Sequence, residues 1–270
     1  MINIKLSDAE NSLKDTLLGY SSLGVAVSGG GDSTLLAKVA ADVMPESKLV
    51  LVHALLPFSP KRESEFIQKW ASDNGLKLHI LEIDMLQYDD VVRNDSRRCY
   101  YCKHKIMGAL SEEMHRQGIE VVADGTVTDD YGDYRPGLDA AAEHNIQHPL
   151  ADAGFDKRMI RLLARKLHLP GWNMPASACL ASRIQCGIAL TREVLEQVGT
   201  AEDYLFDLGF AGNRVRVVGT GLACIEVNSL HLARLFRLRR VVSAELQKIG
   251  FKKVMIDLNG YTRGAMNTPV

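Results

Sequence analysis

The segment of the chain best suited to chemistry is Ser28–Ser33, which reads SGGGDS and lies between the apolar run 24–27 and a stretch with helical periodicity. Glycines let successive backbone N–H groups face one point, and the first turn of a helix adds the positive end of its dipole. The segment therefore predicts a site for phosphate or pyrophosphate. It lacks the Lys of a Walker loop and the spacing of a dinucleotide-binding loop. The alternative is a tight strand–helix turn with Ser33 as a helix cap.

Three cysteines form a second set of reactive groups. Cys99 and Cys102 lie in the basic stretch RRCYYCKHK, and Cys179 lies in the irregular stretch PASACLASRI. A helix start and nearby cations both favour the thiolate over the thiol. The C-x-x-C spacing suits a metal, an iron–sulfur cluster or a redox disulfide. Cys179 could instead act alone as a nucleophile that gives up its own sulfur, and three unrelated thiols are the remaining alternative.

Composition limits the classes of function. The 270 residues carry a net charge of −1, which gives no general attraction to nucleic acid or to an anionic membrane. The first ten residues have no apolar signal core, and no apolar run reaches membrane-spanning length. Five cysteines without such a signal favour a reducing compartment, where thiols work as ligands or nucleophiles. We expect a cytoplasmic protein.

The first part of the chain alternates apolar runs with helical periodicity, which predicts an α/β fold with a parallel sheet covered on both faces. The runs are 24–27, 48–56, 76–83 and 119–125, and the helical stretches are 6–19, 33–43, 61–74, 100–117 and 157–167. Residues 126–150 are expected to be rich in loops, since turn signals are frequent there. Such sheets bind ligands at the carboxyl ends of their strands.

The pattern changes near Leu169, where two prolines interrupt any regular period. The following order is helix, strand, strand, helix and strand, predicted at 191–208, 214–219, 222–227, 228–248 and 253–258. This is an α+β pattern. The sequence therefore predicts an α/β domain with the phosphate site over 1–168 and a smaller α+β domain over 169–270.

The glycine-rich segment resembles the SGGxDS signature of the PP-loop ATP pyrophosphatases. In that superfamily the loop holds the β,γ-pyrophosphate of ATP while a substrate oxygen attacks the α-phosphorus to form an adenylate. The resemblance implies that 1–168 is a PP-loop ATP-binding domain, in which this loop binds ATP with Mg²⁺ close to Asp32, and that 169–270 serves substrate binding or oligomerisation. The implied contacts are Ser28, Gly29, Gly30, Asp32 and Ser33.

Further motifs resemble the LarE family over nearly the whole chain: RCYYCK, ADGTVTDDYGDYRPG, LPGWNMPASACLASRIQCG and DLNGYTRGAMN. LarE proteins are ATP-dependent sulfur transferases that build the nickel-pincer nucleotide cofactor. They adenylate a carboxylate of a pyridinium dicarboxylate mononucleotide and convert it to a thiocarboxylate. The resemblance therefore implies a small nucleotide substrate, a sulfide or other sulfur source and, as in LarE relatives, a homo-oligomer.

The resemblance leaves two sources of sulfur open. Either the cysteine that matches Cys179 loses its own sulfur and becomes dehydroalanine, or three cysteines hold a 4Fe–4S cluster that carries sulfide. Because Cys99, Cys102 and Cys179 occur together, we favour the cluster. Cys186 departs from the family pattern, since RIQCG stands where relatives often have RIPYG.

Residues near the predicted ATP site come from two stretches. Gly125 ends a strand and is placed for close backbone approach to the nucleotide. Candidate magnesium or ribose contacts are its neighbours Asp124, Thr126, Asp129 and Asp130. The alternative is that these acids are solvated loop residues. Arg135 would contact a phosphate or these acids. Arg183 would neutralise charge at the α-phosphate as a catalytic residue with Cys179 and Asp32, or form an interdomain salt bridge.

The substrate site is expected on one strand of the second domain. Arg214 and Arg216 alternate and so project from the same strand face, which suits a phosphate or a pair of carboxylates. They match family positions for the mononucleotide, and Glu226 is similar to a family residue near the bound metal or substrate. The alternative is a polar outer strand face with one cross-strand ion pair.

Three other residues carry structural expectations. His53 at the end of an apolar strand is expected to be a satisfied structural histidine, and Trp70 to lie in the core. Trp172 in the proline-rich stretch could cover a ligand.

Other PP-loop chemistries are alternatives to sulfur transfer to a small nucleotide. Thiolation of tRNA would predict a basic chain with an RNA-binding module, and neither is visible. An amide-forming synthetase would not need the three thiols. A nucleotide-binding sensor that retains the loop without catalysis is a further alternative.

Overall fold

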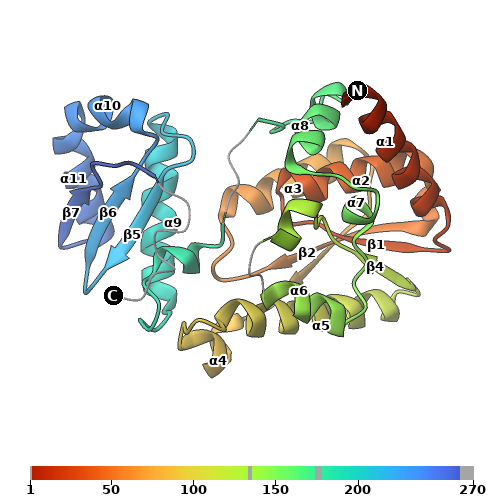
Figure 1. Ribbon diagram of the computed structural model, residues 1–270. Helices are drawn as coiled ribbons and strands as arrows, with labels where there is room; N and C mark the ends of the chain where they lie inside the picture. Colours follow the sequence, from red (N-terminus) through yellow and green to blue (C-terminus); the bar gives the residue numbers. More distant parts are fainter. Residues whose placement is uncertain (1, 133–135, 174–177, 262–270) are drawn as a thin grey trace. The chain divides into compact units, whose positions relative to one another are not determined.

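The computed structural model describes residues 2–132, 136–173 and 178–261, which fall into two compact units (Figure 1). The first unit comprises 1–56, 61–83 and 99–173, and the second comprises 57–60, 84–98 and 174–270. The sequence prediction divided the chain once, after residue 168. In the structure two short segments from the first half of the chain, 57–60 and 84–98, belong to the second unit.

The first unit is built on a parallel sheet with strand order β3-β2-β1-β4, which confirms the predicted α/β class. The strands are β1 (Leu23–Ala26), β2 (Leu49–Leu55), β3 (Leu78–Glu82) and β4 (Val121–Ala123). Sequence order reverses between β1 and β4, and open α/β sheets bind ligands beyond the carboxyl ends of strands at such a point. The segment Ser28–Ser33 follows β1 directly, so it lies at this position.

Helices cover both faces of this sheet. The helices of the first unit are α1 (Ile2–Leu18), α2 (Gly31–Val43), α3 (Lys61–Asp73), α5 (Arg98–Arg116), α6 (Pro136–Glu143), α7 (Pro149–Asp152) and α8 (Lys157–Lys166). The stretch 126–150, expected to be rich in loops, contains α6 and α7, and both are too short to produce a clear helical period.

Alternation along β2 explains how one strand serves two cores. Leu49 and Leu51 pack with α1, α2 and α8, whereas Val50 and Val52 pack with side chains of α5 such as Met107. Successive strand residues point to opposite faces, so a continuous apolar run is required when both faces are covered. These two cores fix the carboxyl ends of β1 and β4.

The second unit contains a sheet of order β5-β6-β7, in which β5 and β6 are antiparallel and β6 and β7 are parallel. Its strands are β5 (Arg214–Val218), β6 (Leu222–Glu226) and β7 (Lys253–Ile256), and its helices are α4 (Asp89–Val92), α9 (Arg192–Asp207), α10 (Leu232–Arg237) and α11 (Arg239–Ile249). The single helix predicted at 228–248 is divided at Leu238, which has a non-helical ψ of 1°. Within the described ranges, no helix is long and apolar enough to span a bilayer.

Candidate functional site

The loop after β1 has the geometry of an anion cradle. Gly29 has a φ of +85°, and a Cβ atom there would lie 2.5 Å from the Glu63 carbonyl oxygen, so only glycine fits. The Gly30 amide donates to Ser28 Oγ at 3.2 Å, and the Ser28 amide donates to Ser33 Oγ at 3.2 Å. The N-cap of α2 is Gly30 without a side-chain cap, so Ser33 is not the cap that the alternative interpretation required.

Gly125 brings the segment after β4 against this loop. A Cβ atom on Gly125 would lie 2.6 Å from the backbone nitrogen of Ser33. The sequence predicted a close backbone approach at Gly125 toward a nucleotide, and in the structure the close neighbour is the loop backbone itself. The segments that follow β1 and β4 are therefore in close contact at Gly125, where no side chain fits.

Asp124, one residue earlier, is an anchor. Its buried carboxylate accepts hydrogen bonds from Lys103 Nζ at 3.2 Å, His148 Nδ1 at 2.8 Å and the Thr126 amide at 3.0 Å. Burial by itself would raise the pKa of Asp124, but the charge of Lys103 and the hydrogen bonds from His148 and Thr126 hold that pKa well below its usual range. Sequence reasoning missed Lys103 and His148, since only the fold brings α5 and α7 to the end of β4.

Lys157 was also missed, although its ammonium contacts the loop. Its Nζ lies 2.5 Å from Asp32 Oδ2 and 3.8 Å from Asp130 Oδ1, and its amide donates to Asp129 Oδ2 at 2.6 Å. Asp32 and Asp129 therefore both contact Lys157. Arg135 lies outside the described residues.

The thiols occupy accessible positions. Cys99 is exposed and Cys102 half-buried in the first turn of α5, and their spacing places them on one side of that helix. Cys179 and Cys186 are exposed, whereas burial raises the pKa of the half-buried Cys224 thiol. No group of three or more potential metal ligands was found in the part of the chain that the structure describes. The predicted cluster thus stays a prediction.

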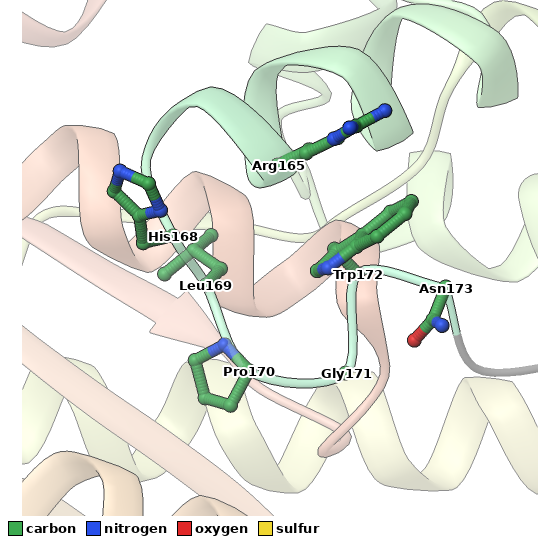
Figure 2. Close-up of a pocket in the computed structure, with 7 residues that line it drawn as sticks. All are labelled: Arg165, His168, Leu169, Pro170, Gly171, Trp172 and Asn173. Carbon is green, nitrogen blue, oxygen red and sulfur yellow. The ribbon is translucent and has the colours of Figure 1, made fainter.

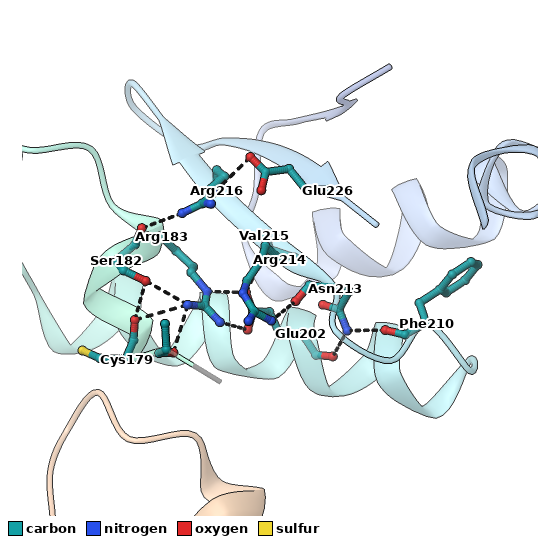
Figure 3. Close-up of polar contacts among 11 residues, drawn as sticks. Cys179, Ser182, Arg183, Glu202, Phe210, Asn213, Arg214, Val215, Arg216 and Glu226 are labelled. Carbon is teal, nitrogen blue, oxygen red and sulfur yellow. Dashed lines mark hydrogen bonds and ion pairs between the residues drawn. The ribbon is translucent and has the colours of Figure 1, made fainter. Parts of the chain in front are cut away.

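Arg183 holds the loop of Cys179 (Figure 3). This guanidinium is 1% exposed and forms a two-point ion pair with Glu202 on α9, at 2.7 and 2.9 Å. Its remaining nitrogen donates to the carbonyl oxygens of Ala178 and Cys179 at 2.9 and 3.3 Å. The ion pair lies within the second unit. The expected contact of Arg183 with an α-phosphate stays a prediction.

Arg214 and Arg216 are buried instead of forming a solvated strand face (Figure 3). Arg216 pairs with Glu226 Oε1 at 3.0 Å and donates to the Ser182 carbonyl at 2.7 Å. Glu226 Oε2 is buried and accepts no hydrogen bond from any described residue. Burial, and then the positive charge of Arg183, lower the pKa of Arg214.

Two structural expectations are confirmed. His53 is buried with Nδ1 2.7 Å from the Val27 carbonyl oxygen and Nε2 2.9 Å from Ser64 Oγ, and burial lowers its pKa. Trp70 belongs to the core between the sheet and its helices. Neither residue is available for chemistry.

Comparisons with known proteins agree with this geometry. The family model for the PP-loop domain matches residues 4–133. The chain is 33% identical to the pyridinium-3,5-bisthiocarboxylic acid mononucleotide synthase of Lactiplantibacillus plantarum, over 97% of this chain and 95% of that protein. It is 37% identical to an uncharacterized protein of Synechocystis sp., over 90% of this chain and 91% of the other. A further uncharacterized protein, from Methanocaldococcus jannaschii, is 29% identical over 95% of this chain and 97% of its own length.

The match to the synthase runs through both units and includes the loop after β1 as well as the segment around Cys179. A cradle that accepts no side chain at Gly29 or Gly125 is the structural counterpart of the PP-loop domain match. With this likeness over almost the full length, the chain belongs to the LarE family of PP-loop ATP pyrophosphatases.

Proposed function

We propose that the protein is an ATP-dependent sulfurtransferase that adenylates a carboxylate of a pyridinium dicarboxylate mononucleotide and replaces a carboxylate oxygen by sulfur. The name of the Lactiplantibacillus relative, a bisthiocarboxylic acid mononucleotide synthase, supports this substrate. The observation that carries the proposal is the buried arginine group next to an exposed Cys179, in a chain that also has the PP-loop.

The first step takes place at the PP-loop. Backbone N–H groups of Ser28–Ser33 and the ammonium of Lys157 bind the β- and γ-phosphates of ATP. A substrate carboxylate oxygen attacks the α-phosphorus, the bond from phosphorus to the β-phosphate oxygen breaks, and pyrophosphate leaves. The partly exposed carboxylate of Asp32 suits Mg²⁺, a hard cation that prefers oxygen ligands and that would neutralise phosphate charge when bound.

The second unit would hold the mononucleotide. Buried Arg214 and Arg216 supply the cationic N–H groups that a phosphate or carboxylate needs. Burial, and then the positive charge of Arg183, lower the pKa of Arg214, and a bound anion beside it would favour its charged form. Glu226 Oε2 is an acceptor with no donor among the described residues, and it suits a ribose hydroxyl or a proton-bearing group of the substrate.

Sulfur enters in the second step. A sulfur nucleophile attacks the acyl carbon of the adenylate, and AMP leaves as a stable anion. Cys99, Cys102 and Cys179 are the thiols that would hold a 4Fe–4S cluster, because thiolates are the ligands of such clusters. Cys99 and Cys179 are exposed and Cys102 is half-buried. When bound, the cluster would supply the transferred sulfide.

Cys179 alone is the competing source. Its thiolate would attack the acyl carbon to form a thioester, and loss of the Cys179 α-proton with cleavage of its Cβ–S bond would leave dehydroalanine and the thiocarboxylate. In either case Arg183 holds the backbone carbonyl of Cys179, so the loop presents the thiol in one place.

The test is an anaerobic reaction with ATP, Mg²⁺, sulfide and the mononucleotide, followed by pyrophosphate release and by mass spectrometry of the product. We expect pyrophosphate release that depends on the mononucleotide, and replacement of oxygen by sulfur. Cys179→Ala should release pyrophosphate without sulfur incorporation, and the matched control Cys186→Ala should do both. Absence of mononucleotide-dependent pyrophosphate release would overturn the proposal.

Iron content and the mass of the protein separate the two sources of sulfur. Iron bound by the wild type and lost in Cys99→Ala, Cys102→Ala and Cys179→Ala supports the cluster. Loss of the mass of hydrogen sulfide from Cys179 after one turnover supports the sacrificial cysteine.

A further inference from the structure

We propose that a basic groove along α8 is a second binding site for pyrophosphate, distinct from the PP-loop and joined to it through Lys157. The groove is the pair of adjoining depressions of about 470 and 420 Å³ that share Arg165 and Trp172 in their walls. The inference rests on the proposed function, because pyrophosphate is the product that this function releases.

The groove carries an excess of positive charge. Its walls contain four cations, Lys157, Arg158, Arg161 and Arg165, and two carboxylates. Both carboxylates accept backbone hydrogen bonds: Asp129 from the Lys157 amide at 2.6 Å, and Asp156 from the Met159 amide at 2.7 Å. They help to fix the start of α8, and they leave a cationic surface on a chain whose net charge is −1.

The arginines of this surface have no ion-pair partner within the described ranges of the chain. Arg158, Arg161 and Arg165 follow one another at helical spacings of three and four residues, so they share one face of α8. Other cations on helices of the first unit are paired within their own helix, as Lys38 is with Asp42 and Lys69 with Asp73. Lys166, on the same helix, is paired with Glu10 at 2.9 Å.

Trp172 adds an aromatic wall (Figure 2). The guanidinium carbon of Arg165 lies 5.3 Å from the centre of the Trp172 ring, and the side chain of Trp172 lies alongside that of Arg165. Stacking on a ring face holds a guanidinium in place while its N–H edges stay available to an anion. Planar arginine forks match phosphate oxygens better than lysine ammonium groups do.

Lys157 connects this groove to the reaction. Its side chain lines the groove and its Nζ reaches Asp32 of the PP-loop at 2.5 Å. From Lys157 to Arg165 the helix rises by about 12 Å, at about 1.5 Å per residue. Pyrophosphate leaving the PP-loop would therefore meet a continuous series of cations. A groove that takes up the product would empty the PP-loop for the next ATP.

Trp172 is also the reporter for the experiment. The protein has two tryptophans, and Trp70 is 5% exposed whereas Trp172 is 38% exposed. In a Trp70→Phe background, Mg²⁺ and pyrophosphate are titrated while the fluorescence of Trp172 is recorded, with sulfate at equal ionic strength as the reference anion. No sulfur acceptor and no turnover are needed.

We expect the fluorescence of Trp172 to change saturably with pyrophosphate concentration, and we expect this change to persist when a non-cleavable ATP analogue fills the PP-loop. Arg161→Gln and Arg165→Gln should each weaken the apparent affinity by roughly tenfold or more, as expected for the loss of a charge-assisted hydrogen bond. Lys166→Gln, the matched control on the same helix, should leave the affinity unchanged.

Three results would overturn the inference: no saturable response, an equal response to sulfate, or complete loss of the response in the presence of the ATP analogue. The outcome is separate from that of the proposed function. If sulfur transfer occurs but the fluorescence of Trp172 does not respond to pyrophosphate, only the groove site is disproved. If pyrophosphate binds but no mononucleotide-dependent turnover is seen, only the proposed function is disproved.

Discussion

The ammonium of Lys157 lies 2.5 Å from the carboxylate of Asp32, so the first residue of α8 is paired with the first turn of α2. The PP-loop contains no lysine, and the fold provides one from 125 residues away in the chain. A Walker loop places its lysine next to the glycines. Here α8 supplies the positive charge.

Lys157→Met is expected to lower kcat/KM for pyrophosphate release by about 10²–10³-fold, the usual effect of removing one donor to a developing charge. The melting temperature should change little, because Lys157 is 39% exposed and Asp32 31% exposed, and such pairs contribute about 0–1 kcal/mol. Steady-state assays and thermal unfolding measure the two effects. Lys38→Met, which removes the 2.6 Å pair with Asp42 on α2, is the control and should retain activity.

Two neighbouring glycines should respond differently to alanine. Gly29→Ala must adopt a left-handed conformation, at a cost of about 1–2 kcal/mol, and its Cβ would meet the Glu63 carbonyl. Gly31→Ala has nothing within 4 Å of the added Cβ and no positive φ. Calorimetric titration with ATP should show lost or strongly weakened binding for Gly29→Ala only. Equal affinities of the two variants would contradict the cradle geometry.

The ion pair of Arg183 and Glu202 should be tested as a pair. Arg183→Met leaves the Glu202 carboxylate without its bidentate partner and should reduce the free energy of unfolding by about 3–5 kcal/mol. Urea unfolding of Arg183→Met, of Glu202→Met and of the variant with both substitutions gives the coupling free energy between the two side chains. We expect the double variant to recover stability relative to Arg183→Met. A stable Arg183→Met variant that fails only in pyrophosphate release would favour the phosphate role instead.

Asp124 predicts a pH dependence of stability. Its folded-state pKa lies below the unfolded value of about 3.9, so its contribution is present above that value and is lost as the pH falls through the folded pKa. Asp124→Asn should be less stable than the wild type by about 3–5 kcal/mol at pH 7, since it breaks a buried charge group. Urea unfolding between pH 7 and pH 3 should show that the difference in unfolding free energy between the wild type and Asp124→Asn decreases below about pH 4. A difference in unfolding free energy that is independent of pH would contradict the network.

Local pattern accounts for most elements of the fold. The four strands of the first sheet and helices α1, α2, α3, α5 and α8 follow from runs and periods that their residues carry themselves. Helices α6 and α7 could not be predicted in this way, because eight and four residues are too few to show a helical period of hydrophobic residues. That 57–60 and 84–98 belong to the second unit could not be predicted either, because packing between segments far apart in the chain leaves no pattern in the local sequence.

The sequence alone determined the parallel α/β sheet, the PP-loop at its ligand-binding edge and the α+β character of the later part, since glycine spacing and hydrophobic period are local properties. Only the tertiary structure decided the partners of charged side chains. It paired Lys157 with Asp32, gave Asp124 its cations and buried Arg183 against Glu202. A charged side chain carries no mark of its partner, because that partner is set by the packing of elements far apart in the chain, and burial then determines what the charge can do.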